Sequence, residues 1–254
     1  MNLLSPSWVS PPDKLTLSAS AVHLWLVRLD ISEEQSGQLA GWLSPDEHRR
    51  AESFKFDQLR NHFIAARGVL RFILGQYLQL NPGQILFRYG AFGKPAIESF
   101  GGRNMLYFNL SHSNGLALYA FTPGGEIGVD IEHVHESADI EQTAAIVFSD
   151  SEITALRALP EEARRPAFFQ YWARKEAFIK ATGEGFSFPL RSIDIQQSPG
   201  KVLANAESPE KQWQYGNWSI RDICPMQGYA AAIACRNDEY PVSFFRMPDM
   251  YFFE

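Results

Sequence analysis

The segment Gly128-Val129-Asp130-Ile131-Glu132 places two acidic residues at alternate positions of a short apolar run. Side chains two residues apart on a strand point to the same side, so Asp130 and Glu132 would present their carboxylates together while Val129 and Ile131 face the core. Adjacent carboxylates repel each other unless a cation lies between them, and hard divalent cations prefer oxygen ligands. The pattern therefore indicates either a metal site or two solvated acids on the wet face of a strand.

A second group lies in the run from Trp172 to Lys180, where aromatic residues recur at helical spacing. Glu176 falls at the edge of this apolar stripe, and Lys180 lies one turn further along the same side. The spacing would let a third carboxylate and an ammonium reach one shared site; the alternative is an ordinary surface Glu–Lys pair. Lys175 projects within the apolar stripe, so its ammonium either reaches solvent along its stem or has a buried partner.

Two further polar segments present groups that suit phosphate binding. An alternating strand ends in Ser111 and His112, which come just before a turn. Neighbours in a strand point apart, so this pair is unconvincing as a nucleophile and base, but such tips present phosphate-binding donors. The turn Phe92-Gly93-Lys94-Pro95 displays one lysine, and its single glycine does not make a usual nucleotide-binding loop. For both segments the alternative is an ordinary polar turn.

Several arginines lie on the two helices predicted before these strands. Arg49 and Arg50 belong to the first, while Arg60, Arg67 and Arg71 recur along one face of the second, opposite its apolar stripe. Charged stripes of this kind are usually solvated, which favours a surface position over contact with a ligand.

The elements that would carry these residues follow from hydrophobic periodicity and helix caps. Capping boxes at Ser44–Glu47 and Ser149–Glu152 predict two helix starts, and Gly183 predicts a helix end. The predicted helices begin at residue 44 and span residues 57–78 and 166–182; the predicted strands span residues 22–29, 85–89, 105–110, 116–121, 127–131, 192–196, 213–221 and 229–235. The order of a helix followed by strands occurs twice along the chain, so the sequence is compatible with an internal duplication. The aromatic tail at residues 240–254 is expected to pack back onto the body.

Composition excludes some classes of protein. The net charge of −6 argues against a protein that coats nucleic acid, although a local basic pocket remains compatible with it. No apolar run approaches the length of a membrane span, and residues 1–14 do not resemble a signal peptide. Two cysteines are too few for a disulfide framework and fit a reducing compartment. We therefore expect a cytoplasmic protein.

Five motifs in order resemble the phosphopantetheinyl transferases of the larger, surfactin-synthetase-activating (Sfp) type. They are the turn 92–95, the segments 109–113 and 128–132, the capping segment 148–152 and the helix segment 172–180, and the resemblance covers residues 40–195. It implies an α+β fold of two pseudo-symmetric halves, each a helix packed on a small antiparallel sheet, with coenzyme A in the cleft between them. Residues 1–125 would form the half on the adenosine side, and residues 126–254 the half that carries the carboxylates.

The same resemblance implies a role for each matching residue. Asp130, Glu132 and Glu176 would hold Mg²⁺ against the coenzyme A pyrophosphate, and Lys180 would meet one of its phosphates. Ser111 and His112 would contact the bisphosphate, Lys94 and Pro95 the adenosine end, and Arg50 the ribose phosphate. Glu47 falls where a related enzyme has a basic residue, so the adenosine side of the pocket would differ.

The implied reaction is transfer of the phosphopantetheine arm of coenzyme A to a serine of an acyl or peptidyl carrier protein, with release of adenosine 3′,5′-bisphosphate. Glu176, Lys180 and His112 are the expected catalytic residues, with Glu176 as the acceptor of the serine proton. The enzyme would act as a monomer, without nucleic-acid or membrane partners. Peptide, polyketide and fatty-acid synthesis all remain open as pathways. The alternatives are a metal-dependent phosphohydrolase (a pyrophosphatase or nuclease) and a non-catalytic coenzyme A-binding protein.

Overall fold

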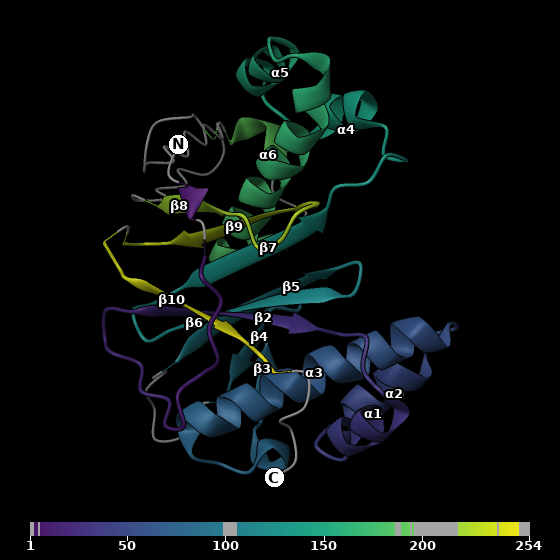
Figure 1. The fold of residues 1–254 in the computed structure, drawn as a ribbon, viewed down its shortest axis with the longest axis vertical. Helices are drawn as coiled ribbons and strands as arrows, with labels where there is room; N and C mark the ends of the chain where they lie inside the picture. Colours follow the sequence, from purple (N-terminus) through teal and green to yellow (C-terminus); the bar gives the residue numbers. More distant parts are fainter. Residues whose placement is uncertain are drawn as a thin grey trace.

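Two four-stranded sheets pack face to face between two layers of helices (Figure 1). The computed structural model describes residues 3–4, 6–98, 106–185, 189–193, 195, 218–237 and 239–248. The apolar side chains of both sheets that face inward form one buried cluster, which includes Leu24, Leu118, Val129 and Ile233. The predicted α+β class is confirmed.

The first sheet has the strand order β10-β2-β6-β5 and carries helix α3 on its outer face. Alternate residues of β2 separate the two faces: Leu24 and Leu26 point to the second sheet, whereas Trp25 and Val27 point to α3. The bounds of its strands and nearby helices are β2 Val22–Arg28, β5 Tyr107–Ser113, β6 Leu116–Thr122, β10 Val242–Arg246, α1 Glu33–Ala40, α2 Pro45–Glu52 and α3 Asp57–Leu78.

The second sheet has the order β1-β8-β9-β7 and carries helix α6 on its outer face. Val129 and Ile131 of β7 face the first sheet, as predicted. Gly128 lies directly under α6, because a Cβ atom at this position would overlap the backbone of Ala177 and Ala181. The bounds are β1 Leu3–Leu4, β7 Ile127–His133, β8 Ser219–Ile223, β9 Tyr229–Cys235, α4 Ile140–Val147, α5 Asp150–Arg157 and α6 Glu161–Thr182.

The two sheets also meet at the edge formed by β5 and β7. Asn109 on β5 accepts a hydrogen bond from the Val129 backbone N–H on β7 at 2.9 Å. Further along, Ser113 accepts one from the His133 N–H at 3.1 Å. These cross-sheet contacts bring the polar tip of β5 beside the acidic residues of β7.

A small hairpin and two short 3₁₀ turns complete the described chain. Strands β3 (Phe87–Tyr89) and β4 (Pro95–Ile97) pair antiparallel and hold the turn that displays Lys94. The 3₁₀ turns η1 (Pro82–Gln84) and η3 (Leu190–Ser192) follow α3 and α6. None of the helices in the described part of the chain has the length and apolarity needed to cross a bilayer.

The first and last described strands each pair with a strand that is distant in the sequence. Strand β1 lies parallel to β8, and β10 lies parallel to β2, while the other strand pairs are antiparallel. Residues 242–246 of the tail therefore pack back onto the body as an edge strand, while residues 249–254 lie outside the described residues. The predicted division of the chain into residues 1–125 and 126–254 remains a prediction. Strand β1 lies in the sheet that contains β7 to β9, and β10 lies in the sheet that contains β2, β5 and β6.

Most predicted elements are confirmed, and the differences are local. Both capping boxes are present, and Gly183 caps α6 in the left-handed conformation. Helix α6 begins at Glu161, so Pro166 lies inside it rather than at its start. Helices α1 and α4 were not predicted. Part of the strand predicted at 192–196 forms the end of η3, and the rest of it, together with residues 105 and 213–217, lies largely outside the described residues.

Candidate active site

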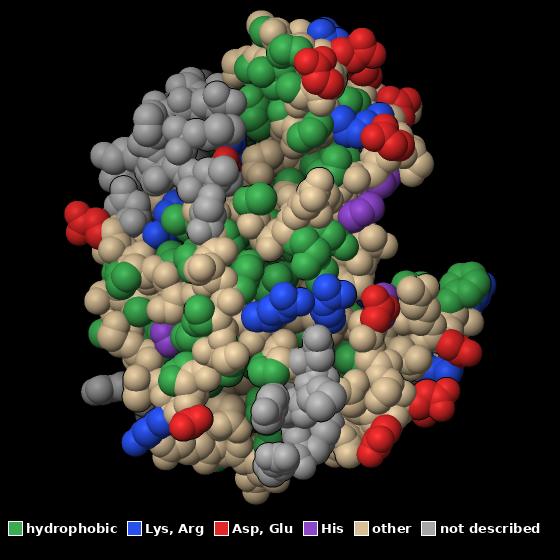
Figure 2. Space-filling model, in the orientation of Figure 1, with side chains coloured by type: hydrophobic (Ala, Val, Ile, Leu, Met, Phe, Trp, Pro, Cys, Tyr) green, Lys and Arg blue, Asp and Glu red, His purple; other side chains and the backbone are tan. Residues whose placement is uncertain are grey.

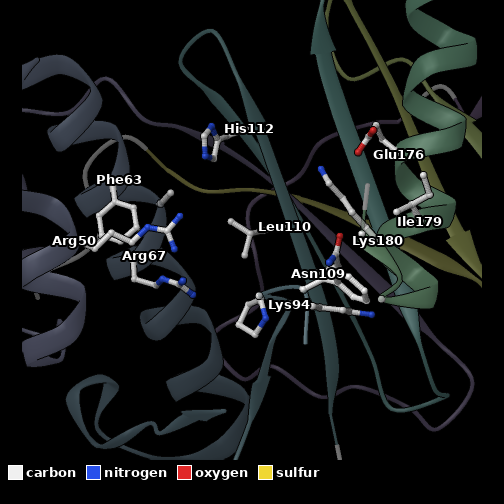
Figure 3. Close-up of a pocket in the computed structure, with 16 residues that line it drawn as sticks. Arg50, Phe63, Arg67, Lys94, Asn109, Leu110, His112, Glu176, Ile179 and Lys180 are labelled. Atoms are coloured by element: carbon white, nitrogen blue, oxygen red, sulfur yellow. The ribbon is translucent and has the colours of Figure 1, made fainter. Parts of the chain in front are cut away.

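A cavity of about 330 Å³ opens between α3, β5 and α6. Six of the residues predicted from the sequence line it: Arg50, Lys94, Pro95, His112, Glu176 and Lys180. In Figure 3 the side chains of Arg50 and Arg67 reach toward β5 from one side, and Glu176 and Lys180 face them from α6. Residues that are distant in the sequence, such as Arg50 and Lys180, thus line one cavity.

The surface around this region is uneven in charge. Figure 2 shows a notch between the part of the molecule that carries α4 to α6 and the part that carries α1 to α3, with acidic side chains gathered at the outer ends of both. Inside the cavity, among the described residues, four basic side chains accompany the carboxylate of Glu176: Arg50, Arg67, Lys94 and Lys180. An acidic protein can therefore still offer a basic pocket to an anion.

Asp130 is almost fully buried beside this cavity, at 1% exposure. Its Oδ1 accepts hydrogen bonds from Lys180 Nζ at 2.6 Å and from Ser111 Oγ at 2.7 Å. Its Oδ2 is buried without a hydrogen-bond partner. Burial raises the pKa of Asp130, and the Lys180 ammonium opposes that rise.

Glu132, two residues further along β7, is held by two donors. Ser113 Oγ lies 3.2 Å from its Oε2, and Trp172 Nε1 lies 3.1 Å from its Oε1. Burial raises the pKa of Glu132, and the Asp130 carboxylate raises it further. The indole of Trp172 therefore has a specific polar role besides its packing.

Glu176 is buried at 6% exposure, and its Oε1 has no hydrogen-bond partner. Burial raises its pKa to about 7; the carboxylates of Asp130 and Glu132 raise it as well, while Lys180 lowers it. The three predicted acids are thus near enough to interact electrostatically. A side chain with a pKa near neutrality can accept or donate a proton at physiological pH.

The donor chemistry of these acids fits a magnesium ion. Asp130 and Glu176 each keep one buried oxygen without a partner, and magnesium binds carboxylate oxygens. Across the described residues, however, no three His, Cys, Asp or Glu side chains already have a metal-binding arrangement. The Lys180 ammonium occupies Asp130 Oδ1 instead.

The tip of β5 is divided between the cavity and the buried acids. Ser111 is not among the cavity-lining residues: its hydroxyl accepts from Lys180 Nζ at 2.8 Å and donates to Asp130. His112, its neighbour, lines the cavity. Desolvation lowers the pKa of His112, and the Lys180 ammonium lowers it further, which favours the neutral imidazole.

Lys94 also lines the cavity, and its ammonium is bound by protein groups. It donates to Glu126 Oε2 at 2.6 Å and to the backbone oxygens of Ile127 and Ala181 at 3.3 and 3.0 Å. These contacts tie the 92–95 turn to the start of β7 and the end of α6. The lysine therefore fixes one wall of the cavity.

The expected solvated arginine stripe on α3 is wrong for two of its three members. Arg71 is 1% exposed and Arg67 is 9% exposed, whereas Arg60 is half-exposed and pairs with Asp57. Glu47 of α2 is the reason, because its buried carboxylate lies 2.7 Å from Arg71 Nε and 3.2 Å from Arg67 Nε. A buried acid provides the partner that buried guanidinium groups require.

Two cavity-lining residues, Phe63 and Arg67, were not predicted as site residues. The guanidinium carbons of Arg50 and Arg67 lie 5.4 and 6.0 Å from the centre of the Phe63 ring. For Arg67 the sequence carried only a weak signal, its spacing of seven residues from Arg60. Of the two alternatives for Lys175, solvent or a buried partner, the structure shows the buried partner: its ammonium lies 2.8 Å from Glu152 Oε2.

Comparisons with known proteins identify the family to which this chain is related. Residues 126–234 match the sequence model described as the 4′-phosphopantetheinyl transferase superfamily. The 4′-phosphopantetheinyl transferase HetI of Nostoc is 40% identical over 91% of this chain and 94% of its own. The L-aminoadipate-semialdehyde dehydrogenase-phosphopantetheinyl transferase of Xenopus laevis is 32% identical over 68% of this chain and 63% of its own.

The predicted resemblance to the Sfp type is also confirmed. The 4′-phosphopantetheinyl transferase Sfp of Bacillus subtilis is 26% identical over 83% of this chain and 90% of its own. The match to HetI extends over nearly the full length of both proteins. This protein therefore belongs to the 4′-phosphopantetheinyl transferase superfamily.

Proposed function

We propose that this enzyme transfers the 4′-phosphopantetheine arm of coenzyme A to a serine of an acyl or peptidyl carrier protein, in a magnesium-dependent reaction that releases adenosine 3′,5′-bisphosphate. Family membership supports the transfer to carrier proteins. The observation that carries the finer proposal is the shared cavity, where basic residues from α2 and α3 face Glu176 and Lys180 of α6. A bisphosphorylated nucleotide with a pyrophosphate link matches such a basic cavity.

Glu176 is the proposed acceptor of the proton from the carrier serine. Its pKa of about 7 leaves much of the carboxylate ionised at slightly alkaline pH and still basic enough to take a proton. Acceptance can be direct or through one water. The nucleophile comes from the partner protein, so the enzyme needs no nucleophilic side chain of its own.

Lys180 is the proposed ligand of a phosphate of the pyrophosphate. Its side chain extends from α6 along the cavity wall, and its ammonium is held in position by hydrogen bonds to Asp130 and Ser111. Phosphoryl-type transfer depends chiefly on positioning and charge neutralisation, both of which a fixed ammonium supplies. Neutral His112 adds a donor on the cavity wall, for the bisphosphate.

Asp130, Glu132 and Glu176 are the proposed magnesium ligands. A bound Mg²⁺ would neutralise charge on the pyrophosphate and orient it. The support is the set of buried oxygens, two of which lack a partner. Burial raises the pKa of all three side chains, and neighbouring carboxylates raise the pKa of Glu132 and Glu176 further. A protein keeps such a set at a cost in stability, which a cation would offset.

We also propose a monomeric enzyme of the cytosol. The resemblance to the larger, Sfp-type transferases supports the monomer, because that type encloses its site within one chain. Cys224 and Cys235 are both free thiols, which is consistent with a reducing compartment.

The direct test is the mass of an apo carrier protein after incubation with enzyme, coenzyme A and Mg²⁺. The expected result is addition of one phosphopantetheine group, lost when a chelator removes the divalent ions and restored by Mg²⁺. Glu176→Gln should lower the rate by at least about 100-fold, since general-base catalysis contributes that much or more. Glu161→Gln, an exposed position in the first turn of the same helix, is the matched control and should retain the wild-type rate.

Two results would contradict the proposal. Release of adenosine 3′,5′-bisphosphate at the same rate without any carrier would identify a hydrolase instead. Transfer by Glu176→Gln near the wild-type rate would remove Glu176 from the reaction.

A further inference from the structure

Helix α6 meets the second sheet along a line of small side chains (Figure 1). The residues of this contact are Ala173, Ala177 and Ala181 on α6, Gly128 on β7, and Ala232 and Ala234 on β9. Residues four apart lie on one face of a helix, so the three helix alanines follow one another along the contact. Small side chains allow a close approach, but they form no ridges that would interlock with the sheet. This line therefore fixes the distance between α6 and the sheet, and its rotation must be fixed by the side chains on either flank.

One flank of α6 is tied to the sheet by a two-point ion pair with β8. Arg174 donates from Nε and Nη2 to Asp222 Oδ1 and Oδ2, at 2.7 and 2.6 Å. Gln170, one turn earlier, donates to the same Oδ1 at 3.0 Å and to the Ala231 backbone oxygen at 2.9 Å. Two parallel N–H···O bonds fix the orientation of a guanidinium as well as its distance. Asp222 thus receives donors from two successive turns of the helix.

The opposite flank of α6 carries the residues of the proposed reaction. Trp172, Glu176 and Lys180 follow one another at four-residue spacing, which places them on one face of the helix. Trp172 Nε1 donates to Glu132 at 3.1 Å, and Lys180 Nζ donates to Asp130 at 2.6 Å, so this face is directed at β7. The alanine line separates it from the β8 flank. Rotation of α6 that breaks the β8 contacts would therefore displace this face relative to β7.

The ion pair on the β8 flank is buried, with Arg174 at 7% and Asp222 at 5% exposure. A buried ion pair adds little net stability, because the cost of desolvation offsets the attraction between the charges. Apolar contact is present on this flank as well, since Phe178 packs edge-on against Trp218 of β8 at 5.8 Å between ring centres. Apolar packing tolerates small displacements, whereas a bidentate pair requires one orientation. The distinct contribution of the pair is therefore directional.

We propose that Asp222 is a positioning residue for the transfer reaction: through Arg174 it sets the rotation of α6 that keeps Glu176 and Lys180 beside the acids of β7. This inference rests on the proposed function, since it assigns how the site of that reaction is held. Neither Asp222 nor Arg174 is among the described residues that line the cavity, so both act through the helix. Misplacement of a reacting group by about 1 Å can lower a rate about 100-fold even when the altered residue is remote from the reaction.

The test replaces both members of the pair in the full chain, Arg174→Met together with Asp222→Val. Removal of one partner alone would leave a buried charge, whereas replacement of a whole buried pair by apolar side chains is often neutral or stabilising. The midpoint of urea unfolding should therefore equal or exceed that of the wild type. The kcat for modification of an apo carrier protein should nevertheless fall about 10- to 100-fold, because α6 loses its fixed rotation. A purely structural pair would leave kcat unchanged in a variant of wild-type stability.

A second readout reports the rotation of α6 without any measurement of activity. The indole N–H of Trp172 donates to Glu132 across the contact between α6 and β7. In a nitrogen–proton correlation spectrum of the double variant, this proton should move upfield because the hydrogen bond lengthens. Trp172→Phe identifies the signal by its loss. The indole of Trp25, which donates to the Tyr77 hydroxyl at 3.0 Å beneath α3, is the internal reference and should not move.

Arg157→Gln together with Glu141→Gln removes an exposed ion pair between α5 and α4 and is the matched control, which should change neither kcat nor the Trp172 signal. A stable Arg174→Met, Asp222→Val protein with the wild-type kcat, or with an unmoved Trp172 signal, would overturn the positioning role. If that protein does not fold, Arg174→Lys keeps the charge but loses the planar fork and should produce both changes. Their absence would again overturn the role. A moved Trp172 signal, with a wild type that modifies no carrier protein, would contradict the proposed function alone.

Discussion

At the scale of single residues, the site is built from charges that are only partly compensated. Lys180 Nζ lies 2.6 Å from one oxygen of Asp130, while the second oxygen of Asp130 and one oxygen of Glu176 are buried without partners. One ammonium therefore faces several acids. Burial is the main cause of the raised pKa of Glu176, and repulsion from the carboxylates of Asp130 and Glu132 adds to it.

This imbalance predicts a pH dependence of stability. The folded pKa of Glu176, about 7, lies above its ordinary value of 4.5, so the folded state holds the proton more tightly than the unfolded state. The free energy of unfolding should therefore fall as pH rises from about 5 to 8, and Glu176→Gln should remove about 2 kcal/mol of that fall. Urea unfolding of both proteins at pH 5 and pH 8, in chelator, measures the difference. Parallel pH profiles of the unfolding free energy for the two proteins would show that ionisation of Glu176 does not destabilise the folded state.

At the scale of elements, helix α6 must lie directly on β7 for its acid and its lysine to reach the site. Gly128 permits that contact, since any side chain there would overlap the Ala177 carbonyl oxygen and the Ala181 nitrogen. Both of these atoms belong to the helix backbone, which cannot rotate away. Gly128 therefore sets the spacing between the β7 acids, Asp130 and Glu132, and Glu176 of α6.

Gly128→Ala should separate α6 from β7. We expect a loss of about 3 kcal/mol in unfolding free energy, at the upper end for overpacking, together with loss of carrier modification. Gly37→Ala in α1 is the matched control, because no atom lies within 4 Å of the added methyl group. That change should stabilise by about 0.5–1 kcal/mol, because alanine favours a helix. Chemical denaturation measures the change in unfolding free energy for both variants. A stable, active Gly128→Ala protein would contradict the close packing.

At the scale of the whole molecule, strands β1 and β10 pair with β8 and β2, which lie far from them in the sequence. Strand β10 covers the edge of β2, where Phe245 packs against His23 and Trp25 at ring-centre distances of 5.0 Å. His23 also lies 2.8 Å from the Tyr77 hydroxyl of α3. Burial at this junction lowers the pKa of His23 to about 4.

The junction should therefore be sensitive to acid. Because the folded pKa of His23 lies below its ordinary value of 6.5, the stability that neutral His23 provides is complete above about pH 6.5 and declines as pH falls toward 4. His23→Asn keeps a polar atom near Tyr77 but cannot titrate. Between pH 7 and pH 5 the wild type should lose about 2 kcal/mol more than this variant, as measured by urea unfolding. Equal losses would place the acid sensitivity elsewhere.

Local sequence determined most of the elements and most of the site. Alternation placed Val129 and Ile131 in the core and the acids on the opposite face of β7, and capping boxes located the starts of α2 and α5. These features depend on interactions between residues a few positions apart, which a sequence displays directly. Six residues predicted for the site line one cavity for the same reason, since short motifs carry them.

The tertiary structure alone decided which charges are buried and with whom. Arg67 and Arg71 look like surface residues on a helical wheel, and only the approach of Glu47 from α2 makes their burial possible. Likewise, the pairing of β10 with β2 and of β1 with β8 joins residues more than 200 positions apart. Periodicity along a chain specifies which face of an element is buried; it contains no information about which distant partner covers that face, because this depends on the packing of the whole.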